Sequence, residues 1–141
     1  MNKQVQVALL LTGNELMSGD TVDSNSSRIA LALGAHKIGV AKKITVGDDP
    51  TLLTDSLMDL CASAEVVIIN GGLGPTKDDL TAELVAEVAG QALVNHPSAI
   101  EHLEEWCERR GLELNASNLK QALLPEGADS VSYTHLTLPT I

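Results

Sequence analysis

The feature that most constrains the fold is residues 66–79, which have the sequence VVIINGGLGPTKDD. Residues 66–69 are all β-branched and too few for a helix, so they predict a strand that is buried on both faces. Glycines and a proline interrupt the chain after this strand, and a helical pattern begins after Asp79. This order favours an α/β protein that holds an anionic ligand at the glycine turn. Phosphate alone would be repelled by the carboxylates of Asp78 and Asp79, which therefore predict a metal ion beside it.

The rest of the chain alternates between strand and helix patterns. Apolar residues predict strands at 5–11 and 37–46, with a polar loop over 12–20 after the first strand. Helices are predicted at 28–33, 52–62 and 80–89, with another beginning at Pro97. Asp49 is expected to cap the second of these helices and Pro50 to occupy its first turn. This alternation predicts a parallel sheet covered by helices on both faces.

Length and charge narrow the functional classes. The 141 residues fit one domain, and nine basic against nineteen acidic residues give a net charge of −10. Nucleic acid and anionic membranes are therefore excluded as general partners, and any phosphate must be held locally. No run approaches the ~20 apolar residues of a membrane helix. The short apolar run near the N-terminus has no cleavage site after it, so a cytoplasmic location is expected.

Residues 131–141, VSYTHLTLPTI, differ from the rest because they contain no Asp, Glu, Lys or Arg. They resemble a terminal string found on unrelated predicted proteins when non-native sequence is read through. We therefore expect one domain over residues 1–130 and a non-native tail over residues 131–141. The alternative is a genuine edge strand over residues 131–138.

Polar clusters follow three predicted strands, at residues 12–15, 47–49 and 71–79. The carboxyl ends of parallel strands lie along one edge of a sheet, where ligands bind, so these clusters are expected to border one cleft. Glycines in the third cluster would let the backbone approach a ligand. Taken alone, a glycine-rich turn of this kind is a weak signal.

Each acidic candidate also has a structural explanation. Asp78 or Asp79 is expected to cap the following helix, which leaves the other free to bind Mg²⁺. Asp48 is similarly freer than Asp49 to face the cleft. Three further residues could line the cleft or serve only as loop and cap residues: Glu15, Asp23 and Asn25. Lys77 could contact a phosphate or be an exposed lysine with no role.

Four linked motifs together resemble the N-terminal domain of the competence/damage-inducible protein A (CinA) family. They are TGNEL at 12–16 with Gly19, Asp23 and Asn25; TVGDD at 45–49; GGLGPT at 71–76 with Asp78 and Asp79; and NLKQALLPEG at 118–127. The match covers residues 5–128 in order. This domain is a branch of the molybdopterin-binding superfamily of molybdenum-cofactor biosynthesis proteins, and the GGLGPTxDD form is typical of the CinA branch.

The resemblance implies an α/β fold of the three-layer αβα sandwich type, with a mainly parallel sheet, and a metal-dependent pyrophosphatase of ADP-ribose or a related nucleotide. It implies that Asp79 leads the catalytic or metal-binding carboxylates, with Asp48 and Asp78 as neighbours and Asp79 and Asp48 as ligands of a divalent ion such as Mg²⁺. The remaining expected ligand contacts are Thr12, Gly13, Glu15, Asp23, Asn25, Gly71, Gly72, Gly74 and Thr76. Superfamily relatives are commonly dimers or trimers, so a homo-oligomer is compatible with the resemblance.

Two other functional readings remain open at this point. The first is a non-catalytic module that binds a pterin or a nucleotide. The second is an inactive fragment, because the family normally continues after residue 128 with a strand and an Asn…Gly-Thr-Ala-Pro-Gly loop that contributes to the same pocket. The tail at 131–141 stands in their place.

Overall fold

The computed structural model of the chain describes residues 4–132 and 137–140. It divides into two compact units, Met1–Gly72 and Leu73–Ile141, here called the N-terminal and C-terminal units. Among the described residues, none of the helices combines the length and the apolar content that a membrane crossing requires.

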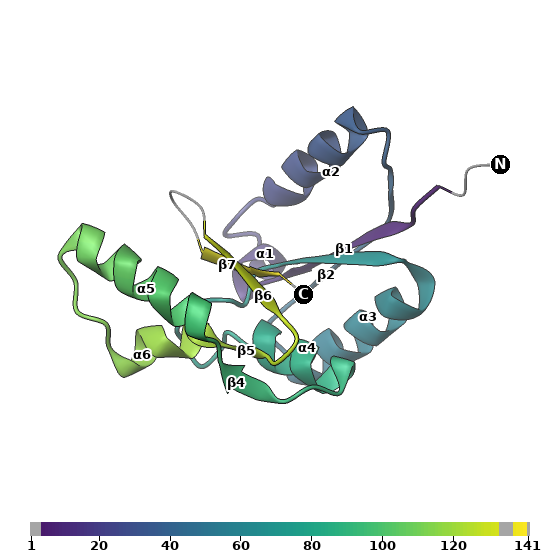
Figure 1. Ribbon diagram of the computed structural model, residues 1–141. Coiled ribbons are helices and arrows are strands. Elements are labelled where there is room, and N and C mark those ends of the chain that lie inside the picture. Colours follow the sequence, from purple (N-terminus) through teal and green to yellow (C-terminus); the bar gives the residue numbers. More distant parts are fainter. Residues whose placement is uncertain (1–3, 133–136, 141) are drawn as a thin grey trace. The chain divides into compact units, whose positions relative to one another are not determined.

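A three-stranded parallel sheet forms the centre of the N-terminal unit (Figure 1). Its strand order is β2-β1-β3, with β1 at Val7–Thr12, β2 at Val40–Val46 and β3 at Val66–Asn70. Every residue of β1 is buried, because this strand has a neighbour on each side. The predicted α/β fold with a parallel sheet is confirmed.

Helix α3, Pro50–Ser63, packs against this sheet. The Asp49 side chain accepts a hydrogen bond from the Leu52 N–H at 2.9 Å, and Pro50 occupies the first turn, so the predicted cap is confirmed. The helix buries three leucines at helical spacing: Leu53, Leu57 and Leu60.

Three local expectations for the N-terminal unit were wrong. Strand β3 is exposed at Val66 and only half-buried beyond it, because among the described strands it pairs on one side alone. The predicted loop at 12–20 contains a short helix, α1, at Asn14–Ser18. Helix α2 spans Asn25–Ala35, so it begins before residue 28 and continues through Gly34.

The C-terminal unit begins with the loop 73–79 and helix α4, Thr81–Ala89. Short elements follow: β4 (Leu93–Asn95), α5 (Pro97–Arg110), α6 (Ala116–Leu119), the 3₁₀ turn η1 (Lys120–Ala122) and β5 (Leu123–Pro125). Strands β4 and β5 pair antiparallel. The core of this unit is an apolar cluster on α5, η1 and the segments after it: Ala99, Leu103, Ala122, Leu124 and Ala128.

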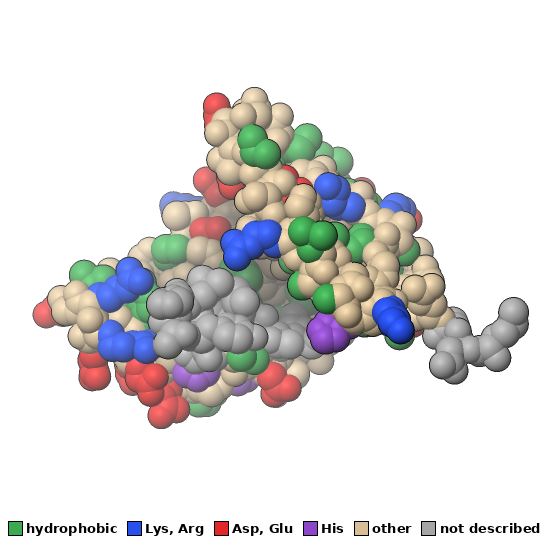
Figure 2. Space-filling view, turned by 90° about the horizontal axis from the view of Figure 1, so that it is seen from above, with side chains coloured by type: hydrophobic (Ala, Val, Ile, Leu, Met, Phe, Trp, Pro, Cys, Tyr) green, Lys and Arg blue, Asp and Glu red, His purple; other side chains and the backbone are tan. Residues whose placement is uncertain are grey.

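Helix α5 has a strongly charged exposed side, where acidic side chains gather with basic ones at one end (Figure 2). Arg109 and Arg110 occupy its last turn, where positive charge complements the helix dipole. The Arg110 guanidinium also lies 4.6 Å from the centre of the Trp106 ring.

Strands β6, Asp129–Ser132, and β7, Thr137–Thr140, pair antiparallel at the end of the described chain. The predicted tail therefore has described backbone at residues 131–132 and 137–140, while residues 133–136 and 141 lie outside the described residues. Its non-native origin stays a prediction.

Candidate functional site

Three residues at the carboxyl ends of β1 and β2 form a hydrogen-bonded group, here called the strand-end cluster: Thr12, Asn14 and Asp48. The Thr12 hydroxyl donates to Asp48 Oδ1 at 3.1 Å, and the Asn14 N–H donates to Asp48 Oδ2 at 3.2 Å. The Asp48 N–H donates in return to Asn14 Oδ1 at 2.9 Å. The half-buried Asp48 carboxylate is thus held by one hydrogen bond on each oxygen.

The sheet register produces this cluster. Thr12, the last residue of β1, pairs with Val46, the last residue of β2, so the two strands end side by side. Among the cluster residues, Asn14 was missing from the predicted site. Its signal was the TGNE sequence itself, because an amide at the start of α1 can both donate to and accept from a neighbouring loop.

Glycines allow neighbouring groups to approach the backbone closely around the cluster. A Cβ at Gly71, where φ is 109°, would overlap the Thr12 carbonyl oxygen. A Cβ at Gly47 would lie 2.6 Å from Asn14 Oδ1, and one at Gly13 would lie 2.6 Å from Glu15 Oε1. The Glu15 side chain therefore folds back over Gly13. Gly71 requires glycine because its φ is positive and the crowding atom belongs to the backbone, whereas the side-chain ends that crowd Gly13 and Gly47 can shift.

Asp23 and Asn25 have mainly local contacts. Asp23 accepts hydrogen bonds from both the N–H and the hydroxyl of Ser26, and the Lys43 ammonium lies 3.6 Å away. The Ser26 hydroxyl and N–H, together with the Lys43 charge, hold the pKa of Asp23 below its usual 3.8. The Asn25 amide donates to Asn70 Oδ1 at 3.4 Å, which places it at the end of β3.

In the C-terminal unit, the Asp79 carboxylate turns back into its own loop, residues 73–79, here called the Asp79 loop. Asp79 Oδ2 accepts from the Thr76 N–H at 2.9 Å and from the Thr76 hydroxyl at 2.7 Å. A backbone hydrogen bond from Gly74 also reaches this carboxylate, which lies 2.7 Å from where a Gly74 Cβ would stand. These donors would otherwise be available to a phosphate.

The predicted helix cap at Asp78 or Asp79 was wrong. Helix α4 begins at Thr81, its N-cap residue is Leu80, and no side chain caps it. Asp79 bonds to the turn before the helix instead, and Asp78 is exposed. The physical reason is that the turn between Thr76 and Asp79 brings the carboxylate within reach of N–H groups earlier in the chain, and this local hydrogen bonding competes with capping of the helix.

Opposing influences set the pKa of Asp79. Burial raises it, but the Thr76 hydroxyl and N–H, the Gly74 backbone and the Lys120 charge lower it by more. The resulting pKa lies below the usual 3.8, so Asp79 is ionised at neutral pH.

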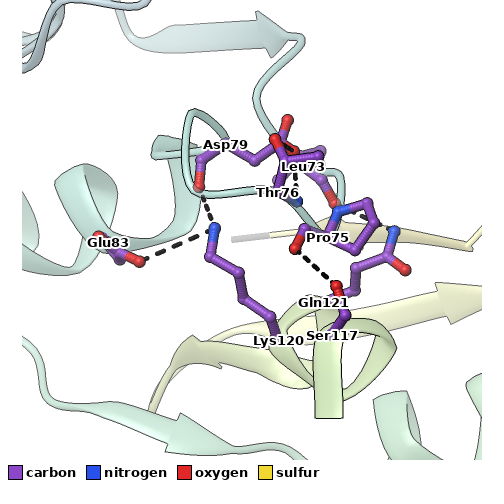
Figure 3. A network of polar contacts seen from close by, with 8 residues as sticks. All are labelled: Leu73, Pro75, Thr76, Asp79, Glu83, Ser117, Lys120 and Gln121. Carbon is purple, nitrogen blue, oxygen red and sulfur yellow. Dashed lines mark hydrogen bonds and ion pairs between the residues drawn. The ribbon is translucent and has the colours of Figure 1, made fainter. Parts of the chain in front are cut away.

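The sequence analysis missed three side chains that contact the Asp79 loop, namely Ser117, Lys120 and Gln121 (Figure 3). They come from α6 and η1; Lys120 and Gln121 belong to the motif NLKQALLPEG, and Ser117 directly precedes it. Their spacing of three and four residues was the available signal, because such residues share one side of a helical turn.

The donor groups limit how a metal ion could bind. Among residues 4–132, no group of three or more His, Cys, Asp or Glu side chains is placed to hold one. Mg²⁺ commonly binds through one or two carboxylates together with waters and substrate phosphates. Each Asp48 oxygen accepts one described hydrogen bond, which leaves it a lone pair. Asp48 can therefore bind Mg²⁺ as a single carboxylate, with waters and phosphates as the other ligands.

The predicted site residues thus fall in two places. The N-terminal unit brings Thr12 and Asp48 together, with Gly13 and Gly71 beside them. The C-terminal unit joins Gly74, Thr76 and Asp79 within one loop.

Comparisons with known proteins agree with this fold. Residues 8–138 match a family model described as "Probable molybdopterin binding domain". A CinA-like protein of Colwellia psychrerythraea is 50% identical over 127 residues, which is 90% of this chain and 29% of that protein. A nicotinamide-nucleotide amidohydrolase, PncC, of Shewanella oneidensis is 38% identical over 124 residues, 88% of this chain and 29% of that protein. The chain thus spans less than a third of these two relatives.

Solved structures show the same fold. A CinA protein of unknown function from Thermoplasma acidophilum superposes with a TM-score of 0.83 at 28% identity, covering 96% of this chain and 79% of that one. The molybdopterin biosynthesis enzyme MoaB of Thermus thermophilus gives a TM-score of 0.59 at 19% identity, with the same coverages of 96% and 79%. The predicted family is confirmed: the chain belongs to the molybdopterin-binding-domain family and is similar within it to CinA-like proteins.

Proposed function

We propose that the intact domain is a hydrolase that cleaves the pyrophosphate bond of ADP-ribose or a related nucleotide with the help of a divalent metal ion. The observation that carries this proposal is the strand-end cluster. It holds the Asp48 carboxylate at the ends of two parallel strands, where glycines allow neighbouring groups to approach the backbone closely. Ligands of open α/β sheets bind at this edge.

Asp48 is the proposed metal ligand of the N-terminal unit. The Thr12 hydroxyl and the Asn14 N–H hold its two oxygens in a fixed orientation and leave a lone pair on each. A divalent ion bound there together with the diphosphate would neutralise its charge and lower the pKa of a water molecule. Gly13, Gly71 and Gly72 would let the diphosphate approach the backbone.

Asp79 is the proposed catalytic or metal-binding carboxylate of the C-terminal unit, with Asp78 as its exposed neighbour. Because Gly74 and Thr76 already donate to Asp79, we propose that they orient this carboxylate rather than bind phosphate directly. Ionisation of Asp79 at neutral pH suits either role.

The alternative is a non-catalytic module that binds a pterin. The family description, which names molybdopterin binding, favours this alternative. The name of the PncC relative instead indicates hydrolysis of a nicotinamide nucleotide by that protein, of which this chain covers 29%. A cytoplasmic location and homo-oligomerisation stay predictions.

The test is release of AMP and ribose 5-phosphate from ADP-ribose by the purified chain, with Mg²⁺ and with a chelator. We expect hydrolysis to require the metal and to fall by about 100-fold or more in Asp48→Asn and in Asp79→Asn. Asp55→Asn, which removes the same charge from an exposed position on α3, is the matched control. Tight molybdopterin binding without hydrolysis under any divalent metal would favour the alternative. Aggregation or poor thermal stability of the chain would indicate an inactive fragment.

A further inference from the structure

Three side chains from α6 and η1 hold the carbonyl groups of the Asp79 loop (Figure 3). The Ser117 hydroxyl donates to the Pro75 carbonyl oxygen at 3.2 Å, and the Gln121 amide donates to the Leu73 carbonyl oxygen at 3.3 Å. The Lys120 ammonium donates to the Asp79 carbonyl oxygen. One short segment thus forms hydrogen bonds with the beginning, middle and end of the loop; this segment is here called the 117–121 clamp.

The clamp complements the contacts inside the loop. Loop N–H groups point to the Asp79 carboxylate, while loop carbonyl groups point to the clamp. A loop whose N–H and carbonyl groups both have partners in one arrangement has few other arrangements of equal energy. The clamp therefore fixes the backbone that carries Asp79.

Lys120 contacts groups on two different elements, the Asp79 loop and helix α4. Its Nζ contacts the Asp79 carbonyl oxygen and lies 3.9 Å from Glu83 Oε1 on α4. Its side chain is 26% exposed, so it is partly withdrawn from water. Since an ammonium has three donors, one lysine can join the end of the loop to the first turn of the next helix.

We propose that Lys120 is a positioning residue for Asp79, acting through the backbone of the loop with Ser117 and Gln121 as its partners. The relevance to hydrolysis rests on the proposed function, but the effect on the loop can be measured without substrate.

The first experiment follows the loop itself in Lys120→Met, in Lys120→Arg and in Lys77→Met. Lys77 is an exposed lysine in the same loop, so Lys77→Met removes an equal charge without touching the clamp. Amide hydrogen exchange at Thr76 should speed up at least several-fold in Lys120→Met and stay unchanged in Lys77→Met. Lys120→Arg, which keeps a cationic donor at this position, should restore the wild-type exchange rate at Thr76. Unchanged exchange in Lys120→Met would overturn the proposal.

The second experiment measures hydrolysis of ADP-ribose by the same variants. Lys120→Met should lower kcat by about 10- to 100-fold with a smaller change in KM, because the carboxylate is misplaced while most binding contacts remain. Lys120→Arg should restore kcat. If the wild-type chain does not hydrolyse ADP-ribose but amide exchange changes as expected, the proposed function fails and the positioning role of Lys120 stands. If the wild type is active and Lys120→Met has the same kcat and KM as the wild type, the positioning role fails.

Discussion

The strand-end cluster and the Asp79 loop each hold an aspartate carboxylate in a fixed orientation, but the hydrogen-bond donors come from different parts of the chain. Each holds an aspartate carboxylate with one hydroxyl and one backbone N–H among its donors. In the strand-end cluster, the donors stand 36 and 34 residues away in sequence, on a different strand end. In the Asp79 loop, both donors belong to a residue three positions away.

The difference shows what each carboxylate depends on. Asp48 depends on the register between β1 and β2, so anything that shifts the sheet also displaces it. Asp79 depends on a local turn that forms its own hydrogen bonds, and the 117–121 clamp then holds that turn from outside. The first site is made by topology and the second by local turn chemistry.

The largest expected effect is a difference in stability between two variants that replace a glycine of each site by alanine. Gly71→Ala should lower the free energy of unfolding by about 3 kcal/mol, because φ is positive there and the new Cβ would overlap the backbone oxygen of Thr12. Gly74→Ala should cost only about 1 kcal/mol, because its Cβ would meet the end of the Asp79 side chain, which can shift at the cost of a hydrogen bond, rather than the backbone. Urea denaturation of both variants provides the measurement. Equal costs at the two positions would contradict the contrast between backbone and side-chain crowding.

The next effect tests whether the strand-end cluster acts as a unit. Thr12→Val and Asp48→Ala should each destabilise the chain by about 1–2 kcal/mol, because each leaves a polar partner without its hydrogen bond. The double variant should cost less than the sum, by about 1 kcal/mol. A double-mutant cycle from denaturation curves measures this coupling. Strict additivity would mean that the 3.1 Å contact contributes nothing to stability.

The smallest effect concerns the pH dependence of the Asp79 loop. Since folding lowers the pKa of Asp79, its ionised form stabilises the folded chain above pH 3.8, and this stabilisation is lost as the pH falls through the lower folded pKa. Wild type should therefore exceed Asp79→Asn in stability by at most about 1 kcal/mol at neutral pH, with the difference shrinking below pH 3.8. Denaturation at a series of pH values measures it. A difference that grows on acidification would contradict the lowered pKa of Asp79.

Sequence patterns predicted best where one local rule decides the structure. The apolar run of β1 and the Asp49-Pro50 start of α3 are examples, because burial and capping chemistry each act within a few residues. The burial of β3 could not be predicted this way, because an apolar strand has the same sequence in the centre of a sheet and at its edge.

In the candidate site, too, some features could be predicted from local sequence patterns and others could not. Polar strand ends indicated Thr12 and Asp48, and the parallel topology brought these two together as expected. The direction of the Asp79 side chain was not predictable, since a carboxylate at this position can reach either the helix ahead or the turn behind. Lys120 was missed because its partner lies 41 residues away and no periodic pattern connects them.

The clamp also has a consequence for the order of folding. The contact between Lys120 and the Asp79 carbonyl spans 41 residues, so its closure requires the chain between them to be largely in place. During synthesis the Asp79 loop emerges before residues 117–121, and domains generally fold as units. We therefore expect the Asp79 loop to acquire its final geometry late, after α5 and η1 have joined the core of the C-terminal unit.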